Sequence, residues 1–180
     1  MDIVLTPLIK EDIELVRTWR NSPEVAQYMY TEDEISTEQQ EAWFEKVKND
    51  ETSKYWVIEY DNKKIGLASI TGINKVLGSC YWAFYLGTDV PRGGGIGSKI
   101  EFNVLEYVFN DLKLNKLRCE VMIFNDKVIS MHEKFGFRRE AYYRQHVKKN
   151  GKWIDTIGLA ILKEEWLKQR EFMQKIIYRD

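Results

Sequence analysis

A glycine-rich stretch near the middle of the chain decides the fold: Arg92-Gly93-Gly94-Gly95-Ile96-Gly97. Four of the eleven glycines fall within residues 93–97, between a strand-like apolar run at 80–86 and a segment at 96–111 whose apolar residues have helical spacing. Glycines lack a Cβ atom and let successive backbone N–H groups converge, while the following helix adds unpaired N–H groups and the positive end of its dipole. This arrangement predicts a pyrophosphate-binding loop.

Two other nucleotide-binding loops fit this stretch less well. A dinucleotide-binding loop follows an N-terminal strand and has the pattern G-x-G-x-x-G, whereas this loop comes mid-chain after an antiparallel hairpin. A triphosphate-binding loop ends in Gly-Lys-Ser/Thr, whereas the order here is Gly97-Ser98-Lys99. A flexible turn without a ligand is the remaining alternative, and Arg92 and the strand-loop-helix context argue against it.

The rest of the chain predicts a mixed α/β protein. Ser36 and Gln39 fit a capping box, so a helix is expected to begin there, and Asn150-Gly151 is a strong hairpin signal. The order of strand, glycine loop, helix and strand indicates two neighbouring parallel strands. A polar, amphipathic tail at 163–180 is expected to pack on the core or against another subunit. The expected helices span 10–21, 36–47, 96–111 and 126–135, and the expected strands span 55–60, 64–74, 80–86, 117–124 and two runs that flank 150–151.

Composition indicates a single domain over residues 1–180 with a small-molecule partner. The 27 Lys and Arg nearly balance the 28 Asp and Glu, so no global field favours nucleic acid or an acidic membrane. No apolar run approaches the roughly 20 residues that span a bilayer, and no secretion signal is evident, so a soluble cytoplasmic protein is expected, as a monomer or homodimer. Cys80 and Cys119 lie in apolar, strand-like runs and are expected to be reduced. With only His132 and His146 beside them, no metal site is expected.

Two segments resemble the signatures of one enzyme family, the GNAT superfamily of N-acetyltransferases. Arg92-x-x-Gly95-x-Gly97 is similar to the family pattern Arg/Gln-x-x-Gly-x-Gly/Ala, and residues 125–137, NDKVISMHEKFGF, resemble the next family segment, N-x-x-A-I-x-L-Y-x-K-x-G-F. The resemblance spans residues 1–165 and implies a mixed, mostly antiparallel sheet with helices on both faces. Its two central parallel strands, ending near Leu86 and Phe124, would splay apart to admit the pantetheine arm of acetyl-CoA.

The resemblance also implies where acetyl-CoA would bind. Backbone N–H groups of the glycine loop would hold the pyrophosphate, and the thioester would lie along the splayed strands, with no metal involved. The residues expected to contact this cosubstrate are Tyr85, Leu86, Gly87, Arg92, Gly93, Gly94, Gly95, Ile96, Gly97, Ser98, Asn125, Lys127 and Lys134.

A free amine is expected to attack the thioester directly, without a covalent enzyme intermediate. The backbone N–H of Leu86 is the expected oxyanion donor. His132 stands where the family often has a tyrosine that acts as general acid, and it is either that acid or a partly buried, hydrogen-bonded residue. The strand before the loop carries no carboxylate, so Ser69, Thr71 and Glu120 are the candidates to relay the amine proton, and each has a structural role as its alternative.

The N-terminal block suggests the acceptor. Trp19-Arg20-Asn21 and Tyr28-Met29-Tyr30 resemble bacterial acetyltransferases that modify the 4-amino group of a UDP-linked deoxy-amino-sugar on the pseudaminic acid pathway, which serves flagellin glycosylation. Arg20 is expected to pair with the diphosphate or, alternatively, to cap the first helix. The aromatic residues, with Trp82, are expected to cover uracil or a deoxysugar methyl group. The substrate-binding set is Arg20, Asn21, Tyr28, Met29, Tyr30 and Trp82.

Two alternative functions stay open at this point. An acetyltransferase of ribosomal-protein N-termini would share the loop and a similar W-R-N start. A non-catalytic acyl-CoA-binding module would keep the glycine loop and lack proton-transfer groups. An amine with a pKa near or below neutral needs little base, which favours an amino sugar over a polyamine or a lysine side chain with a pKa of about 10.4.

Overall fold

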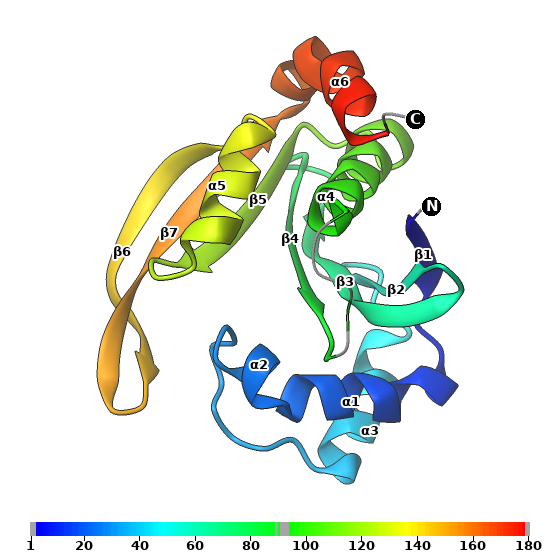
Figure 1. Ribbon diagram of the computed structural model, residues 1–180, viewed down its shortest axis with the longest axis vertical. Helices are drawn as coiled ribbons and strands as arrows, with labels where there is room; N and C mark the ends of the chain where they lie inside the picture. The colour runs from blue at the N-terminus through cyan, green and yellow to red at the C-terminus, as the bar shows by residue number, and fades with distance from the viewer. Residues whose placement is uncertain (1–2, 89, 91–93, 179–180) are drawn as a thin grey trace. The chain divides into compact units, whose positions relative to one another are not determined.

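The computed structural model describes residues 3–88, 90 and 94–178, so Arg92 and Gly93 lie outside the described residues (Figure 1). The strands are β1 (Ile3–Pro7), β2 (Lys54–Tyr60), β3 (Lys63–Asn74), β4 (Ser79–Leu86), β5 (Lys116–Met122), β6 (Arg138–Lys149) and β7 (Lys152–Leu162). The helices are α1 (Ile13–Asn21), α2 (Pro23–Ala26), α3 (Thr37–Val47), α4 (Ile96–Glu106), α5 (Asp126–Lys134) and α6 (Lys163–Ile177), with a 3-10 turn η1 (Lys10–Asp12) and a π-helical turn η2 (Tyr107–Asp111).

The chain divides into two compact units that share strand β4. Unit 1 comprises Met1–Ile73 and Trp82–Gly94, and unit 2 comprises Asn74–Tyr81 and Gly95–Asp180. The strand order is β1-β2-β3-β4-β5-β7-β6, so β1 to β3 belong to unit 1 and β5 to β7 to unit 2. Each unit therefore contains both strands and helices, which agrees with the mixed α/β class that the sequence predicts.

In unit 1, antiparallel strands carry three helices. Strand β1 pairs with β2, and β2 pairs with β3 through the turn at Asp61 and Asn62, which both have positive φ. The Ser36 hydroxyl accepts a hydrogen bond from Gln39 N, and the Gln39 side chain accepts one from Ser36 N, so the predicted capping box starts α3. A core cluster of Val16, Trp19, Val57 and Leu67 holds α1 against these strands.

The central strands β4 and β5 form a parallel pair. Strands β4 and β5 pair at Ser79–Lys116, Cys80–Leu117 and Tyr81–Arg118. Strand β4 continues to Leu86 and β5 to Met122. The central parallel pair expected from the resemblance is thus confirmed.

In unit 2, β7 lies between β5 and β6 in antiparallel pairing, and the β6–β7 hairpin turns at Asn150 and Gly151, both with positive φ. Helix α6 packs beside α4 (Figure 1). The Trp166 indole is fully buried and donates to the Glu106 carboxylate, which also binds Arg170 through two nitrogens. The predicted C-terminal tail is therefore a helix anchored on its own unit.

The predicted elements agree with the structure within a few residues, with two additions, strand β1 and the short helix α2. Strand β1 was not expected, because the short run at Ile3–Pro7 has no turn or alternation signal of its own. The predicted helix at 96–111 ends as an α-helix at Glu106 and continues as the π-helical turn η2. In α6, Trp166 and Met173 are buried as packing on the core requires, whereas Phe172 and Ile176 are exposed.

Candidate active site

The described part of the glycine loop has the backbone that the sequence predicts. Gly94 and Gly95 adopt left-handed φ values of 65° and 68°, which side chains with a Cβ atom rarely tolerate. Gly95 is the N-cap of α4, and a Cβ atom there would meet nothing within 4 Å. Ser98 lies in the first helical turn. The helix start therefore presents its backbone N–H groups at an open glycine surface, which suits an anion.

The end of strand β4 is held by close backbone packing within unit 1. The Gly87 N–H donates to the Ile65 carbonyl at 2.8 Å, so it is already engaged. A Cβ atom on Gly87 would lie 2.3 Å from the indole nitrogen of Trp19, and one on Gly66 would lie 2.2 Å from the Tyr85 carbonyl oxygen. Both glycines are therefore needed for close approach, and they fix the backbone around Tyr85 and Gly87.

A cavity of about 330 Å³, called the unit 1 cavity below, opens beside this end of β4. Its volume falls within the range of about 300–1,000 Å³ that is usual for small-molecule sites. Its lining comes from α1, the α2–α3 segment, α3 and strands β2, β3 and β4, and consists of Val16, Arg20, Met29, Ile35, Gln39, Gln40, Trp43, Tyr55, Leu67, Ser69, Ala83, Phe84 and Tyr85. Segments far apart in sequence thus build one mostly apolar and aromatic chamber.

Among the described residues that line the unit 1 cavity, one is a cation and none is a carboxylate. Burial lowers the pKa of the Arg20 guanidinium, and the neighbouring Tyr85 phenol opposes that shift. Burial also raises the pKa of Tyr85, while Arg20 offsets part of the rise. Arg20 donates to the Thr31 hydroxyl at 2.6 Å, which orients the guanidinium. Since arginine stays protonated in proteins, Arg20 brings a positive charge to the cavity lining.

Gln40 is a lining residue that sequence reasoning missed. It occupies a buried position of α3, four residues before the buried Phe44, and only 5% of it is exposed. Its Nε2 atom has no hydrogen-bond partner among the described residues. A polar residue on the apolar stripe of an amphipathic helix was the available signal.

The predicted substrate-binding residues divide into two groups. Arg20 and Met29 line the unit 1 cavity, as do Ser69 from the catalytic set and Tyr85 from the cofactor set. Asn21, Tyr28, Tyr30 and Trp82 are not among the lining residues. The Asn21 amide instead exchanges two hydrogen bonds of 2.9 Å with the backbone of Ile35, which holds the segment before α3. Trp82 is buried and stacks on Phe84, whereas Tyr28 and Tyr30 are 43% exposed.

His132 is buried rather than open to solvent. Its Nδ1 atom lies 2.7 Å from Oε1 of Glu101 on α4, and the two side chains are 4% and 0% exposed. Burial raises the pKa of the Glu101 carboxyl, and the contact with His132 opposes that rise. His132 is therefore a buried residue in contact with Glu101, which fits the second alternative given for it from the sequence. The pair joins α4 to α5, whose remaining candidates are half-buried Asn125 and exposed Lys127 and Lys134.

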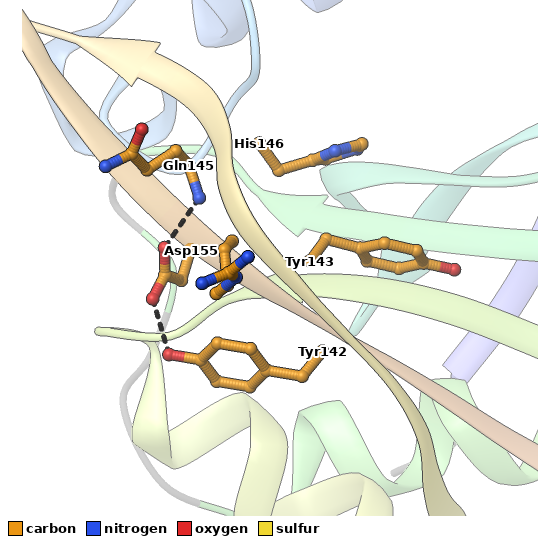
Figure 2. Close-up of a pocket in the computed structure, with 6 residues that line it drawn as sticks. Tyr142, Tyr143, Gln145, His146 and Asp155 are labelled. Carbon is orange, nitrogen blue, oxygen red and sulfur yellow. Dashed lines mark hydrogen bonds between the residues drawn. The ribbon is translucent and has the colours of Figure 1, made fainter.

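The β6–β7 hairpin carries a second hollow, of about 620 Å³, around a wide bulge (Figure 2). Three residues of β6 lie between the pairs Tyr143–Thr156 and Val147–Ile154, opposite a single residue of β7, Asp155. Its carboxylate accepts hydrogen bonds from the Tyr142 hydroxyl and from Gln145 N, which has positive φ. These hydrogen bonds lower the pKa of Asp155. The carboxylate thus fixes the bulge.

The same bulge brings an imidazole to Glu120. In Figure 2 the rings of Tyr143 and His146 lie on the opposite side of β6 from Asp155 and stack with centroids 5.0 Å apart. His146 Nε2 is 3.8 Å from Glu120 Oε2. Glu120 stands two residues after Arg118, the last residue of β5 that pairs with β4. Glu120, the candidate base on β5, therefore has an ionisable neighbour.

Within residues 3–88, 90 and 94–178, no three His, Cys, Asp or Glu side chains gather to hold a metal ion. Among the described helices, none is long and apolar enough to span a membrane. Cys80 and Cys119 are buried free thiols.

Comparison with known proteins places this geometry in a family. Residues 2–138 match the acetyltransferase (GNAT) domain. Acetyltransferase PseH of Campylobacter jejuni subsp. jejuni serotype O:23/36 (strain 81-176) is 30% identical over 132 residues, which cover 73% of this chain and 80% of that protein. Spermidine N(1)-acetyltransferase of Escherichia coli (strain K12) is 25% identical over 169 residues, which cover 94% of this chain and 90% of that protein.

A solved structure has the same fold. Spermidine N-acetyltransferase from Vibrio cholerae in complex with CoA and spermine has a TM-score of 0.87 to this chain at 23% identity, and the match covers 92% of this chain and 98% of that one. The family match covers more than half of the sequence and includes the glycine loop. The chain therefore belongs to the GNAT acetyltransferase family and is an N-acetyltransferase.

Proposed function

We propose that this enzyme transfers acetyl from acetyl-CoA by direct attack of a primary amine, and that the amine is the 4-amino group of a UDP-linked deoxy-amino-sugar. Acetyl-CoA supplies the thioester that the amine attacks. The observation that carries the proposal is the composition of the unit 1 cavity, which has one guanidinium, aromatic walls and no carboxylate among its lining residues.

A sugar nucleotide matches that lining. Arg20 can form charge-assisted hydrogen bonds to a phosphate oxygen, and Trp43, Tyr55 and Tyr85 offer ring surfaces to uracil or to a deoxysugar methyl group. The Ser69 hydroxyl faces the same chamber and is our candidate to relay the proton that the attacking amine loses. The cavity is then the acceptor site of the reaction.

The glycine loop fits the pyrophosphate of acetyl-CoA. Left-handed Gly94 and Gly95 lead directly into α4, whose first N–H groups, with Ile96, Gly97 and Ser98, are unpaired within the helix. We assign Arg92, Gly93, Asn125, Lys127 and Lys134 to the same cosubstrate by the family pattern. The Leu86 N–H, at the free end of β4, is the proposed donor to the thioester oxygen.

A polyamine is the competing acceptor, because spermidine acetyltransferases match 94% of this chain. Amines with a pKa of about 10.4 are charged at neutral pH, and burying such a charge requires a paired carboxylate. The unit 1 cavity offers Arg20 instead, which repels an ammonium group. The physical chemistry of the lining therefore favours the sugar nucleotide.

The test is release of CoA thiol with four acceptors: a UDP-linked 4-amino-4,6-dideoxy sugar, an N-terminal peptide, spermidine and an aminoglycoside. Turnover with the sugar nucleotide alone is expected. In Arg20→Met the KM for that sugar nucleotide should rise about 10- to 100-fold, because a charge-assisted hydrogen bond is lost, with the KM for acetyl-CoA within about twofold. Lys46→Met, at an exposed lysine of α3, is the control and should leave both values unchanged. Turnover of spermidine and not of the sugar nucleotide would sink the proposal.

A further inference from the structure

Gln40 lines the unit 1 cavity, and its buried side-chain amide nitrogen has no protein partner among the described residues. Residue 40 sits in α3 just after the capping box, so its backbone is fixed by the bond from Gln40 N to the Ser36 carbonyl at 3.0 Å. The residue is 5% exposed and lines the cavity, and its Nε2 atom has no hydrogen-bond partner in the described part of the chain.

Leaving a buried amide unpaired costs free energy, and buried polar groups in native proteins nearly always have a partner. An apolar residue such as leucine would fill the same stripe position of α3 without that cost. The amide therefore weakens the empty protein, and this loss is recovered when a bound molecule accepts the hydrogen bond. A residue of this kind is expected to contribute to ligand recognition.

The side chains that line the cavity indicate which chemical groups a ligand would need in order to bind there. Arg20 and the Gln40 NH2 group are both donors, so they call for oxygen atoms that accept hydrogen bonds. An ammonium group has three donors and no acceptor, and would face two donors here. Sugar hydroxyls, an N-acetyl carbonyl and the uracil carbonyls all offer the required uncharged oxygen.

We infer that Gln40 is a specificity-determining residue, whose side-chain amide donates a hydrogen bond to an uncharged oxygen of the acceptor and discriminates against polycations. The inference rests on the proposed function in taking the unit 1 cavity as the acceptor site. It adds a second donor to the one that Arg20 supplies for phosphate. Discrimination between an uncharged oxygen and a polycation then depends on the amide of Gln40. Glutamate at position 40 would have nearly the same shape, but its carboxylate would favour the polycation.

The experiment measures binding separately from turnover. UDP-N-acetylglucosamine, which has no free amine to react, is titrated by calorimetry into wild type, Gln40→Leu and Gln40→Glu, and each variant is unfolded in urea. In Gln40→Leu the Kd should rise about 5- to 100-fold, while the urea midpoint stays equal or rises because an unpaired polar group is removed. In Gln40→Glu the Kd should rise further and spermidine binding should strengthen. Glu41→Gln, at the exposed neighbour on α3, is the matched control.

Three results would overturn the inference: an unchanged Kd in Gln40→Leu, no binding by the wild type, or a lower urea midpoint that accounts for weaker binding. Failure of the proposed function looks different. If the wild type binds UDP-N-acetylglucosamine through Gln40 but acetylates no amino sugar nucleotide, the cavity recognises sugar nucleotides and the proposed reaction is wrong.

Discussion

Replacing His132 with phenylalanine should destabilise the protein strongly, because it strands a buried carboxyl group. Glu101 is fully buried, its Oε1 contacts His132 Nδ1 at 2.7 Å, and its Oε2 has no hydrogen-bond partner among the described residues. Removing one member of a buried pair costs about 3–5 kcal/mol. For a chain of this length the loss corresponds to a fall of about 6–20 °C in Tm.

A double-mutant cycle tests this reasoning. Urea unfolding is measured for His132→Phe, Glu101→Leu and the double variant, with His146→Phe as control at the partly exposed second histidine. Because two apolar side chains of similar size replace a buried pair at little cost, the double variant should be more stable than His132→Phe alone. Additive losses, or a loss below about 1 kcal/mol in His132→Phe, would refute the pairing argument.

The pair also predicts the sign of a pH dependence. Burial raises the pKa of Glu101 above its ordinary value of 4.5, so the folded state holds this proton more tightly than the unfolded state. The contribution of Glu101 to stability is therefore complete below pH 4.5 and is lost as the pH rises through the folded-state pKa. In Glu101→Leu that decline should be absent, so the wild-type unfolding free energy minus that of the variant should fall as the pH rises.

The same variant separates structure from chemistry at His132. A general acid contributes about 10²- to 10⁴-fold to the rate. If His132 only joins α4 to α5, kcat of folded His132→Phe at low temperature should stay within about threefold of wild type. A larger loss in kcat, with the affinity for acetyl-CoA retained, would show that His132 acts as the general acid.

Three further perturbations follow from the described contacts. Gly87→Ala places a Cβ atom 2.3 Å from the Trp19 indole nitrogen and should cost about 1–3 kcal/mol in urea unfolding; an unchanged midpoint would contradict the close approach. Arg170→Met removes the two-nitrogen pairing with Glu106, and should cost about 1 kcal/mol and speed amide exchange in α6, whereas unchanged exchange would show that the helix is anchored otherwise. Burial raises the pKa of Cys80 to about 12, so iodoacetamide at pH 8 should label this thiol only after unfolding; fast labelling of native protein would contradict its burial.

Local signals in the sequence predicted most of the fold. The capping box at Ser36 and the hairpin at Asn150-Gly151 each depend on a few neighbouring residues, and both appear in the structure as predicted. The described glycines of the loop, Gly94 and Gly95, lead into α4 with positive φ. Strand β1 was missed because a five-residue edge strand is stabilised by its partner β2 and not by a pattern of its own. The π-helical end of α4 likewise has no sequence signature.

The site was harder to predict, because its lining comes from segments that only the fold brings together. Arg20 and Met29 were predicted and line the unit 1 cavity, whereas Gln40 and Trp43 on α3 were not considered. Trp82 is of a residue type that often covers ligands. In the structure, however, its side chain is buried and stacks on Phe84. Which face of a strand is buried is a tertiary property, so residue type alone cannot assign it.

Fold likeness and acceptor preference therefore come from different parts of this molecule. The backbone that resembles spermidine acetyltransferases includes the glycine loop and the parallel strands β4 and β5, which the proposed function assigns to acetyl-CoA. Under the proposed function, acceptor choice depends on charge in the unit 1 cavity, where Arg20 is the only charged side chain among the described lining residues. An ammonium group about 5 Å from a guanidinium is repelled by about 3 kcal/mol at an effective dielectric constant of about 20. That repulsion alone weakens polyamine binding about 100-fold, so a chain with this lining should reject spermidine despite sharing the fold.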